Sequence, residues 1–378
     1  MKTFTKSLLI IRFDLELYQM KIAILSPPWI AIPPKGYGGI EKVVADLTEN
    51  LVQMGHQVML FATGDSKTKA DLRYEFEKAL GNNLFLKNNI YIYLKHLHKF
   101  FKIIQQEKFD IIHNHVGYVA YYFLDLQNIP FVHTLHEAFY KNLKAPSGFI
   151  KEKIDTLLRF KHHPYISISN NQRVDFPQLN YIKTIYNGIN PDDFKPIIKK
   201  KNYLAWIGRI TYNKGVDIAI KVAAKAGIPL KIAAFIDKGD FEYFNNKIKP
   251  LIKETKTELI GEIKDKKVKN QFLGEAIATL FPIRWREPFG IVMIESMACG
   301  TPVVAFNKGS VPEVIEDKKT GFIVKNEDQM VAALKDISKI DPLYCYQYAT
   351  TNFSTQKMTK DYLESYQIVI NKFKNNEK

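Results

Sequence analysis

The feature that most constrains this 378-residue chain is an alternation of short apolar segments with helical ones, which occurs twice along the sequence. A strand-like run at 21–25 is followed by apolar residues at helical spacing between Ile40 and Val52. Turn-forming pairs at 187–191 interrupt the pattern, which restarts at 203–207 and continues to Val324. Strands separated by helices predict a parallel, doubly wound sheet. We therefore expect an α/β protein with two Rossmann-like domains and a cleft between them. The other strands expected in the first half lie at 57–62, 110–112, 131–132, 166–168 and 183–186.

The length of the chain also favours two domains, because 378 residues exceed the size at which one hydrophobic core usually keeps growing. We expect a first domain at 20–194, a second at 195–350 and a final helical segment at 351–378. The folded pattern begins cleanly after residues 1–19, which indicates an N-terminal appendage. Lysines crowd 195–201, as is typical of a linker.

Charge and cysteine content exclude several classes of protein. The 54 Lys and Arg residues outnumber the 39 Asp and Glu residues, for a net charge of +15. The charge is dispersed, and no RNA-recognition, zinc-finger or helix-turn-helix signature accompanies it, so we expect no nucleic-acid partner. Two cysteines are too few for a disulfide framework or a cysteine-based zinc site. The apolar run at 8–11 is too short for a signal peptide, and no later segment is long enough to span a bilayer, so we expect a cytoplasmic protein.

Two loops carry residues suited to phosphate. Gly36 to Glu41 separates the first strand from the first helix, where glycines allow close backbone approach to a ligand. It is not a dinucleotide fingerprint, because the third glycine of G-x-G-x-x-G would fall on Glu41. On the first loop of the second domain, Arg209 offers a planar fork and Lys214 a mobile point charge. Together these two cations can converge on a diphosphate.

Glu287 and Glu295 lie in the most informative segment of the chain. Glu287 occupies a proline-containing turn, and Glu295 lies inside a predicted helix that begins at Gly290 and ends at Gly300. The backbone N–H groups at that helix start lack helical acceptors and suit a phosphate. Carboxylates beside such a site suit a ligand that carries both phosphates and hydroxyls, as a nucleotide sugar does. The helix-start donors are those of Phe289, Gly290, Ile291 and Val292.

This segment, Arg-Glu-Pro-Phe-Gly-Ile-Val-Met-Ile-Glu-Ser-Met-Ala-Cys-Gly-Thr-Pro-Val from Arg286, resembles the Glu-x7-Glu signature of retaining glycosyltransferases of family 4, which have the GT-B fold. The matching motifs are spread from Ser26 to Val324. The resemblance implies two Rossmann-like domains and a C-terminal helix that crosses back onto the first. It also implies transfer of a hexose from a nucleoside-diphosphate sugar with retention, by front-face attack, and without a metal cofactor. The absence of a D-x-D motif agrees with this.

The resemblance also implies roles for individual residues. Glu287 contacts sugar hydroxyls at the reacting face, Glu295 holds the ribose hydroxyls, and His136 contacts the sugar near its C6 hydroxyl. Arg209 and Lys214 bind the diphosphate. The glycine loop, with Gly38 and Gly39, contacts the donor phosphate or the acceptor. One departure from the family pattern lies at 233–237, where Ala-Ala-Phe-Ile-Asp replaces a glycine-rich turn and puts any donor contact there in doubt.

Three alternative functions stay open at this point. A phosphorylase or a sugar-phosphate synthase would share the fold and differ in the acceptor. The second is a non-catalytic nucleotide- or carbohydrate-binding protein. Such a protein would not need to keep all four of the charged residues Arg209, Lys214, Glu287 and Glu295. A metal-dependent hydrolase would bind its metal through four histidines near strand ends. The adjacent histidines at 162–163 are instead expected to lie on the surface. The four histidines are His113, His115, His133 and His136.

The identity of the substrates is the least constrained part of the reading. UDP-glucose is the first donor to consider, because the forms of 37–41 and 61–66 resemble the UDP-hexose branch of the family; GDP-mannose is the second. The acceptor is expected to be a glycan or a lipid-linked intermediate. The basic, aromatic segment 91–102 could form an amphipathic helix that contacts an anionic membrane, although packing into the core is the commoner fate of such a helix.

Overall fold

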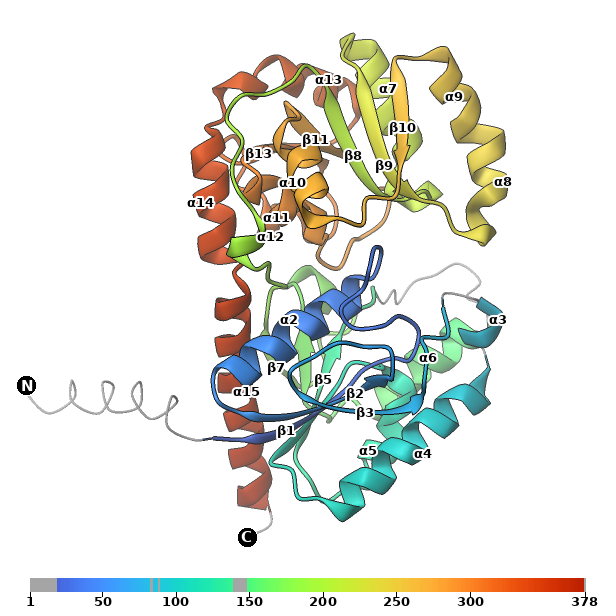
Figure 1. The fold of residues 1–378 in the computed structure, drawn as a ribbon, viewed down its shortest axis with the longest axis vertical. Helices are drawn as coiled ribbons and strands as arrows, with labels where there is room; N and C mark the ends of the chain where they lie inside the picture. Colours follow the sequence, from blue (N-terminus) through green and yellow to red (C-terminus); the bar gives the residue numbers. More distant parts are fainter. Residues whose placement is uncertain (1–18, 82–83, 88, 139–147, 377–378) are drawn as a thin grey trace, which may run out of the picture.

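The computed structural model consists of two lobes stacked along the long axis of the molecule (Figure 1). It describes residues 19–81, 84–87, 89–138 and 148–376. The predicted N-terminal appendage therefore lies, apart from Gln19, outside the described residues.

The first lobe contains a parallel sheet of seven strands in the order β3-β2-β1-β4-β5-β6-β7. Helices cover both faces of this sheet, with α2 on one and α4 on the other (Figure 1). The strands are β1 (Lys21–Leu25), β2 (Gln57–Thr63), β3 (Asp71–Phe76), β4 (Ile111–Asn114), β5 (Phe131–Leu135), β6 (Tyr165–Ser167) and β7 (Tyr181–Thr184). The α-helices are α2 (Gly39–Gln53), α3 (Leu84–Lys87), α4 (Ile90–Gln106), α5 (Tyr121–Leu124) and α6 (Gly148–Arg159).

The second lobe contains a parallel sheet of six strands in the order β10-β9-β8-β11-β12-β13. Its strands are β8 (Leu204–Arg209), β9 (Leu230–Phe235), β10 (Thr257–Gly261), β11 (Ala278–Phe281), β12 (Val303–Phe306) and β13 (Gly321–Val324). Its α-helices are α7 (Val216–Ala226), α8 (Phe241–Tyr243), α9 (Lys249–Glu254), α10 (Lys266–Gly274), α11 (Ile291–Ala298), α12 (Val311–Val314), α13 (Glu327–Lys335) and α14 (Pro342–Asn352).

Both sheets follow the same doubly wound order, in which the chain starts at a central strand, moves to one edge and then returns to build the other side. The order reverses between β1 and β4 in the first sheet and between β8 and β11 in the second. Ligands of such sheets bind beyond the carboxyl ends of the strands at these reversal points. The predicted fold class, two parallel-sheet α/β domains, is confirmed.

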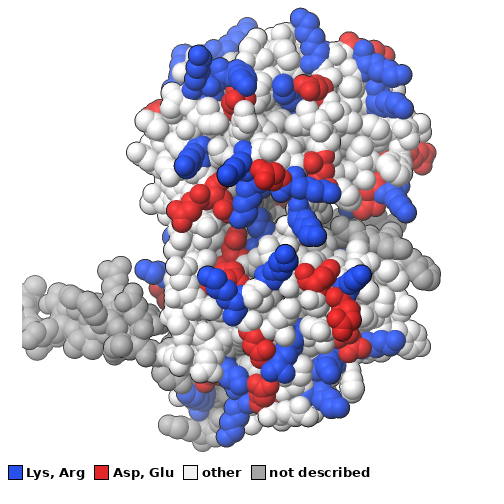
Figure 2. Space-filling model, in the orientation of Figure 1, with Lys and Arg blue, Asp and Glu red and all other residues white. Residues whose placement is uncertain are grey.

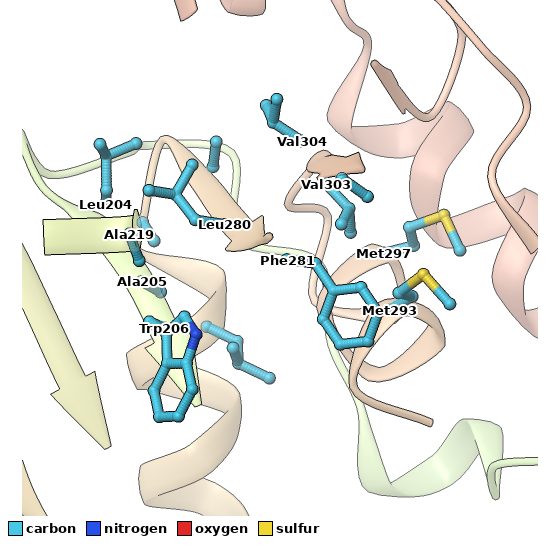
Figure 3. Close-up of a cluster of buried hydrophobic side chains, with 14 of the residues drawn as sticks. Leu204, Ala205, Trp206, Ala219, Leu280, Phe281, Met293, Met297, Val303 and Val304 are labelled. Carbon is cyan, nitrogen blue, oxygen red and sulfur yellow. The ribbon is translucent and has the colours of Figure 1, made fainter. Parts of the chain in front are cut away.

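The core of the second lobe explains why its short strands form where they do. Leu204, Val303 and Val304 are completely buried, as expected for parallel strands covered on both faces. Phe281, at the end of β11, lies beside Met293 and Met297 of α11 (Figure 3). This packing holds the start of α11 against the carboxyl edge of the sheet.

The long final helix, α15 (Thr355–Asn376), packs against the first lobe rather than the second. Met358, Tyr362 and Tyr366 join the hydrophobic core that contains β1 and α2. Ile189 pairs with Ser354 in an isolated parallel bridge where the chain passes between the lobes. The domain boundaries drawn from the sequence stay a prediction.

Two expectations about individual segments need correction or refinement. The stretch 195–201 is not a free linker, since Lys200 Nζ donates to the carbonyls of Gly274 and Gly300, each at 2.7 Å, and so caps two helix ends. The segment 91–102 forms most of α4, and its Phe100 and Phe101 are buried in the core. Its outer face keeps exposed lysines and an exposed Tyr91. No helix among the described residues is long and apolar enough to cross a membrane.

Candidate active site in the interdomain cleft

A cavity of about 790 Å³ lies where the carboxyl ends of the two sheets face each other. Its walls come from the loops that follow β1, β5, β8 and β11, including both reversal points. In Figure 2, basic and acidic side chains both border the hollow between the lobes. All eleven site residues expected from the sequence line this one cavity: Gly38, Gly39, His136, Arg209, Lys214, Glu287, Phe289, Gly290, Ile291, Val292 and Glu295.

Glu287 is held in the cavity wall by two donors. Its Oε2 accepts a hydrogen bond from Lys214 Nζ at 2.6 Å and another from Trp285 Nε1 at 2.7 Å. Lys214 Nζ also lies 5.3 Å from the centre of the Trp285 ring, within cation–π range. Only 9% of Glu287 is exposed, so a carboxylate without such donors would be costly there. The pair joins the side of the cavity expected to bind phosphate to the side expected to bind sugar.

The turn that carries Glu287 is supported by the loop after β12. Ser310 donates through its backbone N–H to the Glu287 carbonyl at 3.1 Å and through Oγ to the Phe289 carbonyl at 2.6 Å. Gly309 has a φ of 59°, and a Cβ there would lie 2.3 Å from the Glu287 carbonyl oxygen. Only glycine therefore allows this loop to approach the Glu287 turn so closely.

The start of α11 forms the floor of the cavity. The helix start lies at Gly290 as the sequence predicts, and Gly290 turns the chain into α11 with a left-handed φ of 78°. Among the described residues, no hydrogen-bond acceptor is found for the N–H groups of Ile291 and Val292. Two N–H groups directed from a helix start are suited to an anion. Glu295, one turn further along and 4% exposed, accepts from Lys269 Nζ of α10 at 2.7 Å.

Arg209 ends strand β8, rather than lying in the loop beyond it as predicted, because the ladder to β9 continues to the Arg209–Phe235 pair. Its Nε donates to Asp240 Oδ2 at 2.6 Å. Each predicted phosphate-binding cation is thus paired with a carboxylate in this structure. A diphosphate entering the cavity would compete with Asp240 for Arg209 and with Glu287 for Lys214.

The glycine loop of the first lobe reaches across to the second. The Tyr37 N–H donates to Glu262 Oε1 at 2.9 Å, and the Tyr37 ring stacks on Phe235 with centroids 5.8 Å apart. Gly38 and Gly39 then begin α2 beside the cavity. At the departure from the family pattern, Phe235 lines the cavity with a bulky side chain in place of a glycine-rich turn. The side-chain surface of this wall therefore differs from the one that the resemblance implies.

His136 is the only one of the four histidines considered for a metal that lines the cavity. Burial lowers its pKa to about 4, so the ring is neutral near pH 7. Its Nε2 lies 2.8 Å from His115 Nδ1, and His115 Nε2 lies 3.2 Å from His113 Nδ1. These ring nitrogens bond to one another and leave no common point for a metal ion. Among the described residues, the four histidines form no group that could hold a metal.

A second hydrogen-bonded set corrects the expectation for the pair at 162–163. His162 is exposed, but His163 is buried and bonds to His133 Nε2 at 3.0 Å through Nδ1 and to Asp125 Oδ1 at 2.8 Å through Nε2. His162, His163 and Asp125 are the one group in the described part of the chain with metal-ligand spacing. This group could bind a metal ion only if the Nε2 atom of His163 carried no proton.

The orientation of the Asn114 amide determines which ring nitrogens of His133 and His163 carry a proton. Its Oδ1 accepts from the Val116 N–H, so its Nδ2 must be the atom that donates to His133 Nδ1 at 3.0 Å. His133 then carries its proton on Nε2 and donates to His163, which in turn carries its proton on Nε2 and donates to Asp125. A metal ion bound to His163 Nε2 would require His163 and His133 each to carry the proton on the other ring nitrogen.

Several residues that line or support the cavity were missed by the sequence analysis. Lys269, Asp240 and Trp285 are the partners of predicted residues, and each lies on a segment without a recognised motif. Asn187 was assigned only to a turn, yet it lines the cavity, and its buried Oδ1 has no hydrogen-bond partner among the described residues. A buried polar atom without a partner calls for an explanation, and a ligand donor would supply one.

Two family models match the chain and together span most of it. The model for Glycosyltransferase Family 4 matches residues 37–193, and the model for Glycosyl transferases group 1 matches residues 190–349.

Individual relatives and solved structures agree with these matches. An uncharacterized glycosyltransferase of Methanocaldococcus jannaschii is 26% identical over 352 residues, covering 82% of this chain and 87% of the relative. An uncharacterized 41.2 kDa protein in the cps region of Klebsiella pneumoniae is 24% identical over 367 residues, covering 87% of this chain and 96% of the relative. The crystal structure of Anabaena HepE in complex with UDP and glucose superimposes with a TM-score of 0.68 at 17% identity, covering 93% of this chain and 100% of HepE. The chain belongs to glycosyltransferase family 4 and is a nucleotide-sugar-dependent glycosyltransferase with the GT-B fold.

Proposed function

We propose that the protein transfers a hexose from a nucleoside-diphosphate sugar to an acceptor hydroxyl with retention of anomeric configuration. The observation that carries this proposal is the contact between Lys214 and Glu287 inside the interdomain cavity. It brings a cation suited to phosphate and a carboxylate suited to sugar hydroxyls to neighbouring positions. A nucleoside-diphosphate sugar is a ligand that would use both groups.

The donor would lie along the second-lobe wall of the cavity. Its diphosphate would sit between Arg209, Lys214 and the N–H groups that begin α11, from Phe289 to Val292. Glu295 would hold the ribose hydroxyls, and Glu287 and His136 would contact the hexose. Gly38 and Gly39 would bring backbone close to the phosphate or to the acceptor. These placements follow from the family resemblance together with the shared cavity.

The chemistry would proceed on one face of the sugar. The bond between the anomeric carbon and the diphosphate oxygen breaks, and the acceptor oxygen forms a bond to the same face of that carbon. The acceptor proton passes to the departing phosphate oxygen. Arg209, Lys214 and the start of α11 stabilise the negative charge that develops on the leaving group. We propose that this charge stabilisation makes a metal cofactor unnecessary.

UDP-glucose is the proposed donor, and GDP-mannose is the second candidate. The glycine loop in the form Tyr37 to Glu41 supports the first choice. HepE, which shares the fold, has been crystallised with UDP and glucose, and this supports testing UDP sugars first.

The proposed acceptor is a glycan or a lipid-linked glycan intermediate, which would place the enzyme in the cytoplasm at the inner face of the membrane. A relative encoded in a cps region supports a role in surface polysaccharide synthesis. The outer face of α4 would supply peripheral contact with anionic lipid. It carries exposed Lys95, Lys99 and Lys102 together with Tyr91, which is 70% exposed, and no acidic residue. Flotation with anionic vesicles, compared with a variant in which the three lysines are replaced by Gln, tests this contact.

Product analysis tests the reaction itself. Purified protein is incubated with UDP-glucose or GDP-mannose and a panel of glycan and lipid-linked acceptors, and the anomeric proton of the product is observed by NMR. An α-linked product from these α-linked donors supports the proposal, whereas a β-linked product contradicts it. Release of a sugar 1-phosphate from a glycan and inorganic phosphate, without transfer from either nucleotide sugar, would instead identify a phosphorylase.

A further inference from the structure

A chain of hydrogen bonds runs from the cavity to the C-terminal helix. It begins at His136 in the cavity wall, passes through His115 and His113, and ends at Tyr366 of α15, whose hydroxyl lies 2.7 Å from His113 Nδ1. His113 is completely buried, and so is the phenol of Tyr366. None of the described residues of α15 lines the cavity, so this chain is the direct polar route between the two.

The direction of the hydrogen bonds follows from the Tyr366 hydroxyl. Its one hydrogen-bond partner among the described residues is His113 Nδ1. A phenol is a good donor and an imidazole nitrogen a good acceptor, and a buried phenol proton without an acceptor is costly. Tyr366 therefore donates, and His113 carries its proton on Nε2, which donates to Thr134 Oγ1 at 2.7 Å. Thr134 Oγ1 also accepts from the Tyr362 hydroxyl at 3.1 Å, so the proton left without an acceptor is that of the Thr134 alcohol, a weaker donor than a phenol.

The same reasoning extends along the chain. The single lone pair of His113 Nδ1 faces the Tyr366 hydroxyl at 2.7 Å, and an unprotonated His115 Nε2 only 3.2 Å away would place a second lone pair against it. This repulsion favours a proton on His115 Nε2, which leaves His115 Nδ1 as an acceptor. His136 must then donate from Nε2 to that nitrogen. Its other ring nitrogen, Nδ1, is left without a proton on a residue that lines the cavity.

We propose that Tyr366 is a positioning residue that acts through His113 and His115 to hold His136 with an unprotonated Nδ1. His136 is consequently a hydrogen-bond acceptor for a ligand hydroxyl and not a donor to a ligand carbonyl or phosphate. The contact of this nitrogen with the hexose rests on the proposed function, whereas the protonation pattern of the four residues does not. A reversed chain would put a proton on His136 Nδ1 and strand the phenol proton of Tyr366.

The helix offers a matched control for this role. Tyr362 lies one turn before Tyr366, is equally buried, and its hydroxyl lies 3.1 Å from Thr134 Oγ1 rather than from an imidazole. Tyr362→Phe removes a buried phenol from the same core but leaves the donor to His113 in place. A purely structural role for these phenols predicts similar consequences for Tyr362→Phe and Tyr366→Phe.

The first experiment measures the tautomer of His136 directly. Protein labelled with ¹⁵N in its histidine rings is studied by NMR near pH 7, and the His136 signals are assigned by their loss in His136→Gln. We expect the proton on Nε2 in the wild type and in Tyr362→Phe. In Tyr366→Phe we expect a shift toward protonation on Nδ1, since reversal no longer strands a phenol proton. A wild-type His136 protonated on Nδ1, or equal spectra for both Phe variants, would overturn the inference.

The second experiment separates the tautomer from the sugar contact. Affinities for UDP-glucose and UDP, or for GDP-mannose and GDP if the wild type prefers guanine, are measured for the wild type and both Phe variants. Loss of one neutral acceptor predicts about a fivefold weaker binding of the nucleotide sugar to Tyr366→Phe, with the free nucleotide unaffected. Equal affinities despite a changed His136 tautomer would support the relay and contradict the sugar contact. Wild-type protein that binds neither nucleotide would contradict the proposed function while the NMR result still decides the relay.

Discussion

Lys214 Nζ lies 2.6 Å from Glu287 Oε2, although the two residues come from loops that follow different strands of the second sheet. Both side chains are mostly shielded, with 23% and 11% of their surfaces exposed. In the proposed donor complex, Lys214 would turn toward the diphosphate and release a carboxylate oxygen for the sugar. Binding of the diphosphate would therefore free the Glu287 carboxylate to contact the sugar.

This relationship predicts strong non-additivity between substitutions of the two residues. Lys214→Ala and Glu287→Ala should each lower kcat by about 10²- to 10³-fold, in the range of a lost preorganised electrostatic group. The double variant should be far more active than the product of the two effects implies, because the groups act as a unit. Steady-state kinetics of all four proteins measure this. Fully multiplicative effects would argue against coupling. The exposed pair of Lys231 and Glu258, 3.3 Å apart at the far edge of the sheet, is the control and should show almost no coupling.

A methyl group at Gly309 should damage the site without touching a ligand. Gly309→Ala introduces a Cβ into the space of the Glu287 backbone and forces a left-handed φ on alanine. We expect a loss of about 1–3 kcal/mol in the free energy of unfolding and a drop in kcat. Gly239→Ala, at an exposed position of ordinary φ with open space around it, should change neither quantity. Chemical denaturation and kinetics of the two variants provide the comparison, and equal behaviour would show that the Gly309 loop does not support Glu287.

Acid should destabilise the protein from about pH 6.5 downward. Burial lowers the pKa of His96 and of His136 to about 4 and lowers the pKa values of His113, His115 and His133 well below the usual range. The unfolded chain therefore takes up protons near pH 6.5, whereas the folded state does not, so the free energy of unfolding falls as pH decreases. Each histidine contributes a slope of about 1.4 kcal/mol per pH unit.

Urea denaturation between pH 7.5 and 5 measures this slope. His96→Phe should reduce it by the share of one histidine, because His96 is fully buried on α4. His98→Gln, at an exposed position of the same helix, should leave the slope unchanged. A wild-type stability that stays constant between pH 6.5 and 5 would contradict the account of these buried rings.

Activity should not depend on a transition metal. The histidines first considered as ligands bond to one another, and the protons assigned to His133 and His163 oppose metal binding beside Asp125. We expect purified protein to contain no stoichiometric zinc or iron and to keep its transferase activity after EDTA treatment and dialysis. Elemental analysis together with activity recovery measures this. Loss of activity that returns only with added metal would contradict the prediction.

Much of this architecture was predictable from the sequence because strongly apolar strands and helical spacing leave few alternatives. The β1 strand, the α2 helix and the helix start at Gly290 could all be predicted from the residue pattern. Strands β3 and β10 were not recognised, since their exposed and half-buried residues mix charges with few apolar positions, as edge strands do. An edge strand carries only half of the burial signal on which such a prediction rests.

The predicted site residues were found in one cavity, but their partners could not be predicted. Asp240 and Lys269 meet Arg209 and Glu295 only because the fold brings separate helices, strands and loops together. The contact of Tyr366 with His113 joins residues far apart in the sequence, and no local pattern marks it. Composition and periodicity indicate which residues lie on a strand or helix, whereas hydrogen-bond partners depend on how those elements pack.

The most direct test of the central claim is a thermal-shift series on the wild type with UDP, GDP, UDP-glucose and GDP-mannose. A ligand that binds only the folded state raises Tm by mass action. The account predicts a rise with one nucleotide and its sugar, reduced in Glu295→Ala, which removes a carboxylate from the cavity, and retained in Glu258→Ala, which removes an exposed one at the sheet edge. Absence of any shift in folded wild-type protein, or an equal shift in both variants, would contradict the placement of the donor in the interdomain cavity.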